Sequence, residues 1–303
     1  MKVRWGIDQL APLLEELGIE RPLLVASPRW DDAGLPAVDR WREIPSHRIV
    51  CPDGTDGLLA AGGGSAIDTA KAASAAADLP LVSVPTTYSG AEWTESYGVR
   101  DPDKRMVGGG GGAKLAGIVY EPKLTLDLPR PASGGTAMNA LAHCVEALYP
   151  GDLEAARRGA ALIVEWLPRV FENLEDLDAR THLLEGASAA GEALAAHGLA
   201  LGHAMAQAVG GRYGLPHGAL NSICLPAAMR FNAEVAPLAL EVVPVATVEE
   251  LGRLAGFTRL RDLEVPHEDL AELAEAVAVR PGARANPRPA SPAEIAELLR
   301  SVW

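Results

Sequence analysis

The sequence has little of three things that many protein classes require: cysteine, positive charge and long hydrophobic runs. Only three of its 303 residues are cysteine, and they are scattered at Cys51, Cys144 and Cys224. This number and spacing exclude a disulfide framework and a cysteine-based zinc site. We therefore interpret each cysteine as a small, buried apolar residue.

The shortage of positive charge argues against a nucleic-acid-binding protein. Lysine and arginine number 27 against 40 acidic residues, for a formal net charge of −13. Nucleic-acid-binding proteins hold phosphates with clustered Lys and Arg, so we expect a small-molecule partner rather than a nucleic acid. The sequence has no uninterrupted stretch of about 18 apolar residues, which is the length needed to span a membrane. Acidic residues also interrupt the N-terminal segment, where a signal peptide needs an apolar run. We expect a cytoplasmic protein with no membrane partner.

The length corresponds to about two domains, and the first third alternates between strand and helix patterns. Residues 7–18 have apolar positions at helical spacing. Short apolar runs at 22–27, 57–63 and 80–87 are typical of buried parallel strands, and the small-residue segment 65–77 is typical of a helix. This alternation predicts an α/β domain with a parallel sheet.

The character of the chain changes after about residue 130. Ala-rich helical patterns dominate residues 134–230, and the Pro- and Gly-containing segment 129–135 marks a boundary. We therefore expect an α/β dinucleotide-binding domain over 1–132 and an all-α domain over 133–303. The run Gly108–Gly112 predicts a loop rather than the interior of a strand.

A cluster of glycines stands between a predicted strand and a predicted helix, at Gly62, Gly63, Gly64 and Ser65. The free N–H groups of such a junction suit a phosphate, and glycines let a diphosphate approach closely. We expect Ser65 to cap the helix and to offer its hydroxyl. An ordinary tight turn would explain the glycines equally well, because Ile67 stands where the common dinucleotide fingerprint has its last glycine.

A second group of polar residues follows the next predicted strand, at Thr86, Thr87 and Ser89. The carboxyl ends of parallel strands lie at the edge where open α/β sheets bind ligands. These hydroxyls are therefore candidates to contact the ribose, phosphate or nicotinamide of a dinucleotide bound at the glycine turn.

Three histidines lie in predicted helical segments. His143 follows Asn139 by one helical turn, so both share a face; His203 precedes Gln207 by one turn, and His217 follows a proline. Imidazoles and an amide that converge between helices would hold a divalent metal or polarise a carbonyl group. A lone histidine on an apolar helix is more often a packing residue, and spacing alone does not reject that interpretation.

Several ordered motifs resemble the iron-containing alcohol dehydrogenase family, and within it the maleylacetate reductases. They are GGGSAIDTAKA, PTTYSGAEWT, EPKLTLDLP, MNALAHCVEALY, HAMAQAVGGRYGLPHG and NPRP. The resemblance runs over nearly the whole chain. It implies the dehydroquinate-synthase-like architecture of this family, with an α/β domain that binds NAD(H) or NADP(H), an all-helical domain, and an enzyme that is often a homodimer.

The resemblance also implies a metal site, from which this sequence departs. Metal-dependent members bind Fe²⁺ or Zn²⁺ with an Asp and three His, and the matching positions here are Asn139, His143, His203 and His217. Asn139 is neutral, so we expect weak or absent metal binding, with any metal held by the three histidines. Maleylacetate reductases likewise carry Asn there. A second departure is Gln207, which replaces a histidine thought to relay protons.

These observations leave three functions open. The first is a metal-independent, maleylacetate-reductase-like enzyme of aromatic-compound catabolism that reduces a small carboxylated enone or carbonyl, with His143, His203, His217 and Asn139 stabilising the developing charge. The second is a metal-dependent alcohol or aldehyde dehydrogenase, and the third is a nucleotide-binding member with little catalysis. Lys104 and Arg105 are candidates to pair with a substrate carboxylate. The preference for NADH or NADPH stays open.

Overall fold

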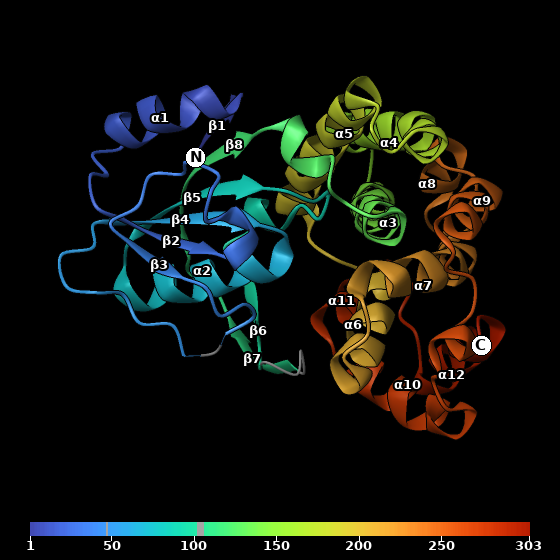
Figure 1. Cartoon of the computed structure of the whole chain (residues 1–303). Helices are drawn as coiled ribbons and strands as arrows, with labels where there is room; N and C mark the ends of the chain where they lie inside the picture. The colour runs from blue at the N-terminus through green and yellow to red at the C-terminus, as the bar shows by residue number, and fades with distance from the viewer. Residues whose placement is uncertain (47, 102–105) are drawn as a thin grey trace. The chain divides into compact units, whose positions relative to one another are not determined.

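The computed structural model describes residues 1–46, 48–101 and 106–303, which form two compact units (Figure 1). The first unit comprises Met1–Thr87 and Ala91–Asp127, and the second comprises Tyr88–Gly90 and Leu128–Trp303. The sequence-based division between residues 132 and 133 falls inside helix α3 (Arg130–Ala147) of the second unit.

The first unit is built on a six-stranded sheet in which every neighbouring pair is parallel. The order across the sheet is β1-β8-β5-β4-β2-β3. The strands are β1 (Lys2–Trp5), β2 (Pro22–Ala26), β3 (Asp39–Trp41), β4 (Gly57–Gly62), β5 (Pro80–Pro85) and β8 (Lys114–Tyr120). The central strands β2 and β4 are buried along their whole length, as their uninterrupted apolar runs predict.

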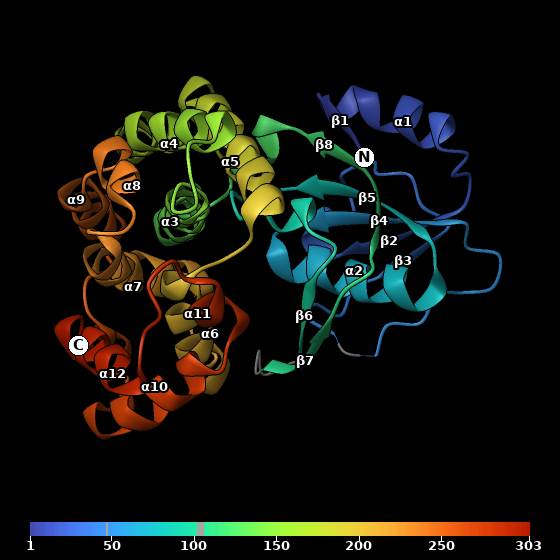
Figure 2. The same ribbon diagram turned by 180° about the vertical axis from the view of Figure 1, so that it is seen from behind.

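Two helices cover the two faces of this sheet, α1 (Leu10–Glu16) on one face and α2 (Gly64–Ala77) on the other (Figures 1 and 2). Side chains alternate along each strand, so Leu24 and Leu59 join the core beneath α1. Their neighbours Leu23 and Leu58 join the core beneath α2. The predicted strand-helix-strand unit is confirmed, with a β4–α2–β5 crossover at its centre.

A two-stranded antiparallel hairpin of β6 (Tyr97–Arg100) and β7 (Met106–Gly110) completes the unit. The prediction that Gly108–Gly112 is a loop is therefore wrong for its first three residues. Backbone hydrogen bonds to β6 hold them as a strand, and Tyr97 lies over Gly110, where a Cβ would be 2.7 Å from its hydroxyl oxygen. Strand pairing uses backbone groups alone. A run of glycines can therefore form a strand without the side-chain pattern from which a strand is predicted.

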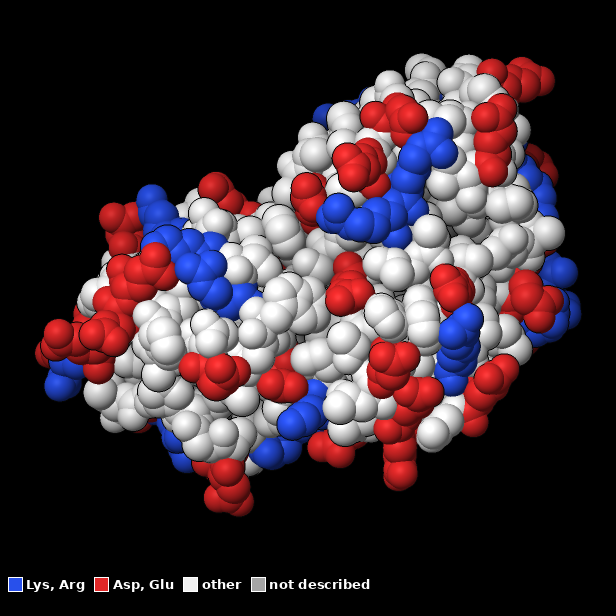
Figure 3. Space-filling model, turned by 90° about the horizontal axis from the view of Figure 1, so that it is seen from above, with Lys and Arg blue, Asp and Glu red and all other residues white. Residues whose placement is uncertain are grey.

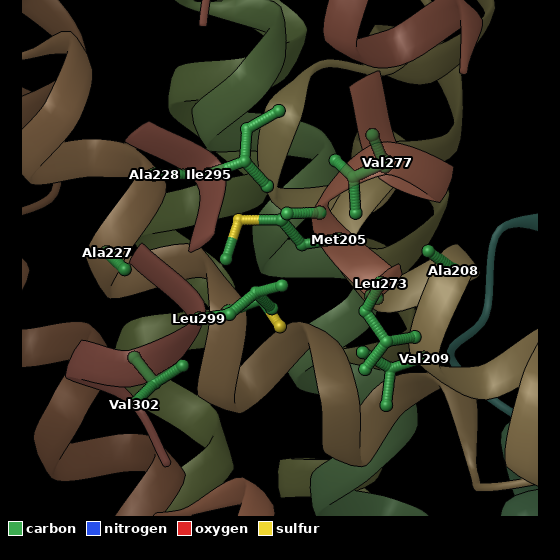
Figure 4. Packing of buried hydrophobic residues seen from close by; sticks show 14 of the residues in the cluster. Met205, Ala208, Val209, Ala227, Ala228, Leu273, Val277, Ile295, Leu299 and Val302 are labelled. Carbon is green, nitrogen blue, oxygen red and sulfur yellow. The ribbon is translucent and has the colours of Figure 1, made fainter. Parts of the chain in front are cut away.

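The second unit, all of whose residues are described, consists of helices and their connections. They are α3 (Arg130–Ala147), α4 (Glu154–Glu172), α5 (Leu177–His197), α6 (Leu201–Tyr213), α7 (His217–Asn232), α8 (Pro237–Val242), α9 (Val245–Ala255), α10 (Leu270–Ala278), α11 (Pro281–Ala285) and α12 (Pro292–Ser301). One of their apolar cores joins α6 and α7 to α10 and α12, with Met205 facing Ile295 and Leu299 (Figure 4). The expected all-α C-terminal domain is confirmed.

The surface carries both signs of charge. On the face shown in Figure 3, Lys and Arg side chains lie among Asp and Glu side chains rather than in one basic stripe. Separately, none of the described helices is both long and apolar enough to cross a membrane.

Candidate functional site

The turn between β4 and α2 leaves two of its glycines no room for a side chain. A Cβ on Gly62, whose φ is +149°, would lie 2.8 Å from the Cβ of Ala66. A Cβ on Gly63 would lie 2.8 Å from Cγ2 of Thr87. Gly63 is also the N-cap residue, in an extended conformation, so the prediction that Ser65 caps the helix is wrong. Ser65 is instead an exposed residue of the first helical turn.

The end of β5 closes this turn from the side. The N–H of Thr86 donates to the carbonyl of Gly62 at 3.0 Å. The hydroxyl oxygen of Thr87 is buried and has no hydrogen-bond partner among the described residues. The first N–H groups of α2 have no partner within the helix and favour an anion. A side-chain-free cradle with an unpartnered hydroxyl beside it suits the phosphates of a dinucleotide.

A second cluster lies within the helical unit and brings together the four residues singled out there. Asn139 and His143 lie on α3, His203 on the first turn of α6, and His217 at the start of α7. The rings of His143 and His203 are stacked with centroids 4.7 Å apart. The ring of His217 lies 5.6 Å from that of His203. The three histidines thus form one continuous group.

Glu146, one turn beyond His143 on α3, anchors this group. Its Oε2 accepts from Nδ1 of His203 at 2.7 Å and from the N–H of Ala200 at 2.6 Å. Its Oε1 accepts from the N–H of His203 at 3.0 Å. The carboxylate therefore caps the start of α6 and fixes the orientation of the His203 ring.

Two asparagine side chains extend the hydrogen bonding. Nδ2 of Asn139 donates to the carbonyl of Ser89 at 2.7 Å, which leaves its Oδ1 facing the histidines. Nδ2 of Asn221 donates to that Oδ1 at 2.6 Å and to Nε2 of His217 at 3.1 Å. Nε2 of His203 lies 3.3 Å from the same Oδ1. We call Asn139, Glu146, His203, His217 and Asn221 the amide–histidine network.

The hydrogen bonds of His203 place an acceptor beside each of its ring nitrogens. Its Nδ1 lies against Glu146, which as a carboxylate only accepts, and its Nε2 faces an oxygen of Asn139 that also only accepts. His203 therefore donates from Nδ1 to the buried Glu146 carboxylate. His217 lies at the edge of the network, where its Nε2 faces the amide nitrogen of Asn221.

His143 differs from its two neighbours. It is buried, and its Nδ1 has no hydrogen-bond partner among the described residues. Burial, followed by the proximity of His203 and His217, lowers the pKa of His143 well below its usual value, so the ring is neutral near pH 7. Gly90, with φ +73°, approaches it so closely that a Cβ would lie 3.3 Å from Nδ1.

The segment Tyr88–Gly90 is held against α3 and α5 of the helical unit. The buried Tyr88 donates its N–H to Oγ1 of Thr136 at 3.3 Å, and its hydroxyl accepts from Nη1 of Arg180 at 3.3 Å. Ser89, predicted with the cofactor residues, presents its carbonyl to Asn139. This segment thus forms one wall of the histidine group.

The remaining predicted residues are placed as follows. Gln207 lies one turn beyond His203 on α6 and is half-buried. Lys104 and Arg105 lie outside the described residues.

Sequence reasoning did not select Glu146 and Asn221. Glu146 lies three residues after His143, and Asn221 four after His217, so each shares a helix face with a selected histidine. That periodicity was the available signal. Their partners lie 57 and 82 residues away, at His203 and Asn139, which only the folded chain brings near.

Two family models match the chain. The model described as iron-containing alcohol dehydrogenase matches residues 48–115, which include the glycine turn. The model of the C-terminal part of the Fe-containing alcohol dehydrogenase family matches residues 134–249, which include the amide–histidine network. Both candidate regions thus lie inside the matched segments.

Individual relatives agree with these models. Maleylacetate reductase of Pseudomonas knackmussii is 32% identical, over 90% of this chain and 88% of the relative. The crystal structure of a putative alcohol dehydrogenase from Ralstonia eutropha JMP134 superposes with a TM-score of 0.89 at 29% identity, covering 100% of this chain and 95% of the other. That of maleylacetate reductase from Agrobacterium tumefaciens has a TM-score of 0.85 at 26% identity, with the same coverage. The chain belongs to the iron-containing alcohol dehydrogenase family and is an NAD(P)-dependent oxidoreductase.

Proposed function

We propose that this enzyme uses NADH or NADPH to reduce a small carboxylated enone or carbonyl compound of the maleylacetate type, without a metal ion. The observation that carries the proposal is the amide–histidine network, in which hydrogen-bond donors stand where a metal-dependent member would place a cation. The relatives named maleylacetate reductase, at about 30% identity over most of the chain, support the substrate class.

The donor set argues against a metal at this position. Asn139 supplies no negative charge, and its Oδ1 already accepts from Asn221. Nε2 of His217 accepts from the same Asn221 amide, and both nitrogens of His203 point at acceptors. Among residues 1–46, 48–101 and 106–303, no group of three or more His, Cys, Asp or Glu side chains is arranged to hold a metal ion. The proposed reaction therefore proceeds without iron or zinc.

For the cofactor, we propose that Gly62, Gly63, Gly64 and Ser65 bind the pyrophosphate through backbone N–H groups. Thr86 and Thr87 position the ribose and nicotinamide, and Thr87 does so with its unpartnered hydroxyl. Bound NAD(P)H supplies the hydride. The protein's part is to hold the substrate in a fixed orientation and to stabilise the charge that hydride addition creates.

That charge develops on the carbonyl oxygen of the enone, as an enolate. His203, whose Nδ1 is held by Glu146, is the group best suited to stabilise it and to donate the proton that completes the reduction. His217 is partly exposed and restores that proton from water, so the role of the missing histidine at Gln207 is fulfilled within the network. His143 and Asn139 orient the substrate oxygen.

The test is an NAD(P)H-oxidation assay with maleylacetate and with simple aldehydes, each in the presence of a chelator and of added Fe²⁺ or Zn²⁺. We expect maleylacetate to be reduced at the same rate under all three conditions. Aldehyde reduction that depends on added metal, with no turnover of maleylacetate, would instead support a metal-dependent alcohol dehydrogenase. Cofactor binding without turnover of any substrate would support a nucleotide-binding role.

Three further expectations stay predictions. A homodimer is tested by size-exclusion chromatography with light scattering, and a cytoplasmic location by fractionation of the producing cell. Pairing of Lys104 and Arg105 with a substrate carboxylate is likewise a prediction.

A further inference from the structure

Two arginines of the helical unit lack the partners that every other described arginine has. Each of the others has a hydrogen-bonding, electrostatic or ring partner; they are Arg4, Arg21, Arg29, Arg40, Arg42, Arg48, Arg100, Arg130, Arg157, Arg158, Arg169, Arg180, Arg212, Arg230, Arg253, Arg259, Arg261, Arg288 and Arg300. Among the described residues, the side chains of Arg280 and Arg284 have none. In a chain with 40 acidic residues, two unpaired cations on one short segment are unusual.

Arg280 is the more constrained of the two. Its Nε is buried and has no hydrogen-bond partner among the described residues. Burial also lowers the pKa of Arg280, and no acidic neighbour acts in the opposite direction. Leaving a buried guanidinium donor unsatisfied is unfavourable, so a ligand that supplies an acceptor there gains the energy of that missing hydrogen bond.

The two arginines are close to each other. The N–H of Arg284 donates to the carbonyl of Arg280 at 3.2 Å, which is the hydrogen bond of a helical turn. Arg280 is the N-cap residue of α11 and Arg284 lies within that helix, so a single turn of chain separates the two side chains. One carboxylate group is the right size to contact both guanidinium groups, which match its planar geometry.

The segment that carries them packs on α6, the helix on which His203 lies. Between them, Gly282 packs so tightly on α6 that a Cβ would lie 2.7 Å from the carbonyl oxygen of Ala200. Ala200 donates its N–H to Glu146, the residue that holds His203. The adjacent position of α11 and α6 is visible in Figures 1 and 2.

A buried amide pair fixes α11 at its other end. Asn286 and Asn232 exchange two hydrogen bonds of 2.9 and 2.8 Å. Oδ1 of Asn286 also accepts from the N–H of Leu201 at 3.4 Å. The segment that carries both arginines is therefore fixed to the first turn of α6, where His203 lies.

We propose that Arg280 and Arg284 form a carboxylate-binding subsite that orients the substrate next to His203. This inference rests on the proposed function for the identity of the substrate, a carboxylated enone. An unpaired guanidinium pair gives an anionic substrate an advantage over a neutral aldehyde of the same size. The pair thereby selects for carboxylated substrates.

The test measures binding and turnover separately in the full-length enzyme. Binding of maleate, a dicarboxylate without a ketone, is measured by titration calorimetry in the presence of NAD⁺ for the wild type, Arg280→Gln, Arg284→Gln and the double variant. Arg253→Gln is the matched control, because it removes an exposed arginine paired with Glu250. We expect maleate affinity to fall at least tenfold in each single variant, further in the double variant, and not in the control.

The turnover measurement distinguishes this subsite from general damage. With maleylacetate, we expect KM to rise at least tenfold while kcat and the KM for NAD(P)H change less than about twofold. Equal maleate affinity in the wild type and the double variant, or no maleate binding by the wild type, overturns the subsite. Arginine-dependent maleate binding in an enzyme that does not reduce maleylacetate upholds the subsite and refutes the proposed function.

Discussion

The carboxylate of Glu146 lies 2.7 Å from Nδ1 of His203, and neither side chain is accessible to solvent. The pair links α3 to α6, because the same carboxylate accepts from the backbone of Ala200 and His203. A buried hydrogen-bonded pair of this kind is unfavourable to break, since removal of either partner leaves a buried polar group without its hydrogen bond. Substitution of Glu146 is therefore a stringent test of the proposed chemistry.

Glu146→Gln should lower kcat while leaving cofactor binding intact. The amide keeps the size of the side chain but removes the carboxylate that accepts from Nδ1 of His203. We expect kcat to fall on the order of 10²-fold, the range expected for loss of a general acid, with the Kd for NAD(P)H within about twofold of wild type. Steady-state kinetics and fluorescence titration measure the two quantities. Glu165→Gln on the surface of α4 is the control, and equal kcat values in the two variants would refute the role of Glu146.

Asn139→Asp should destabilise the metal-free enzyme and create metal dependence. The amide nitrogen donates to the Ser89 carbonyl at 2.7 Å, and a carboxylate oxygen would face that carbonyl without a proton between them. We expect a loss of about 1–3 kcal/mol in the free energy of unfolding. Fe²⁺ or Zn²⁺ should restore stability in the variant and have no effect on the wild type, as followed by thermal unfolding and metal analysis. Equal stabilisation of both proteins by metal would count against metal independence.

Gly63→Ala should weaken cofactor binding at least tenfold. The added Cβ would lie 2.8 Å from Cγ2 of Thr87, so either the turn or the threonine must move. Calorimetric titration with NADH and NADPH measures the effect. Gly111→Ala is the matched control, because a Cβ there meets nothing within 4 Å. Unchanged affinity in Gly63→Ala would place the pyrophosphate elsewhere.

Thr87→Val should have opposite effects on stability and on binding. Valine has the shape of threonine but lacks the buried hydroxyl, which has no partner among the described residues. We expect the cofactor-free enzyme to gain roughly 1 kcal/mol, because an unsatisfied polar group is removed. The affinity for NAD(P)H should fall severalfold. Urea unfolding and calorimetry measure the two effects, and a variant with full affinity would show that the hydroxyl makes no cofactor contact.

Glu92→Gln should change how stability depends on pH. Glu92 is buried; burial raises the pKa of its carboxyl above the usual 4.5, although the hydroxyl of Tyr120 and the charge of Lys71 lower it in part. The folded state therefore keeps a proton that the unfolded chain has released, so stability falls as pH rises from 4.5 through the folded pKa. The glutamine variant lacks this loss.

The measurement is urea unfolding at pH 5 and pH 8. We expect the variant to gain stability relative to the wild type as the pH rises, by on the order of 1 kcal/mol at pH 8. Glu95→Gln, which removes a nearby exposed carboxyl, is the control. A difference between Glu92→Gln and wild type that stays constant with pH would show that Glu92 does not keep its proton on folding.

The sequence predicted the layered unit well because local pattern and fold agree there. Apolar runs bounded by Gly and Pro form the buried strands β2, β4 and β5, and the Ala-rich segment between them forms α2. The N-cap residue of α2 was predicted wrongly because three adjacent glycines offer several positions at which the helix could start. The backbone of Gly63, rather than a side chain, determines which position is used.

The histidine group was predicted by residue type, but its hydrogen bonding was not. Asn139, His143, His203 and His217 were selected, whereas the residues that orient them, Glu146 and Asn221, were not. Their roles arise from pairings between helices across 57 and 82 residues, for which a single sequence carries no distance information. The unpaired state of Arg280 is likewise a property of the folded surroundings.

The short segment Tyr88–Gly90 has a consequence for how this protein is divided. The chain leaves the α/β unit after Thr87 and contributes three residues to the helical unit. It re-enters the α/β unit at Ala91 and leaves it again after Asp127. A fragment ending at residue 127 would take Tyr88 away from Arg180, and the remaining fragment would lose the carbonyl that Asn139 contacts. The two units therefore cannot be exchanged between relatives through a single junction. A chimera of two relatives needs its junctions on both sides of these three residues.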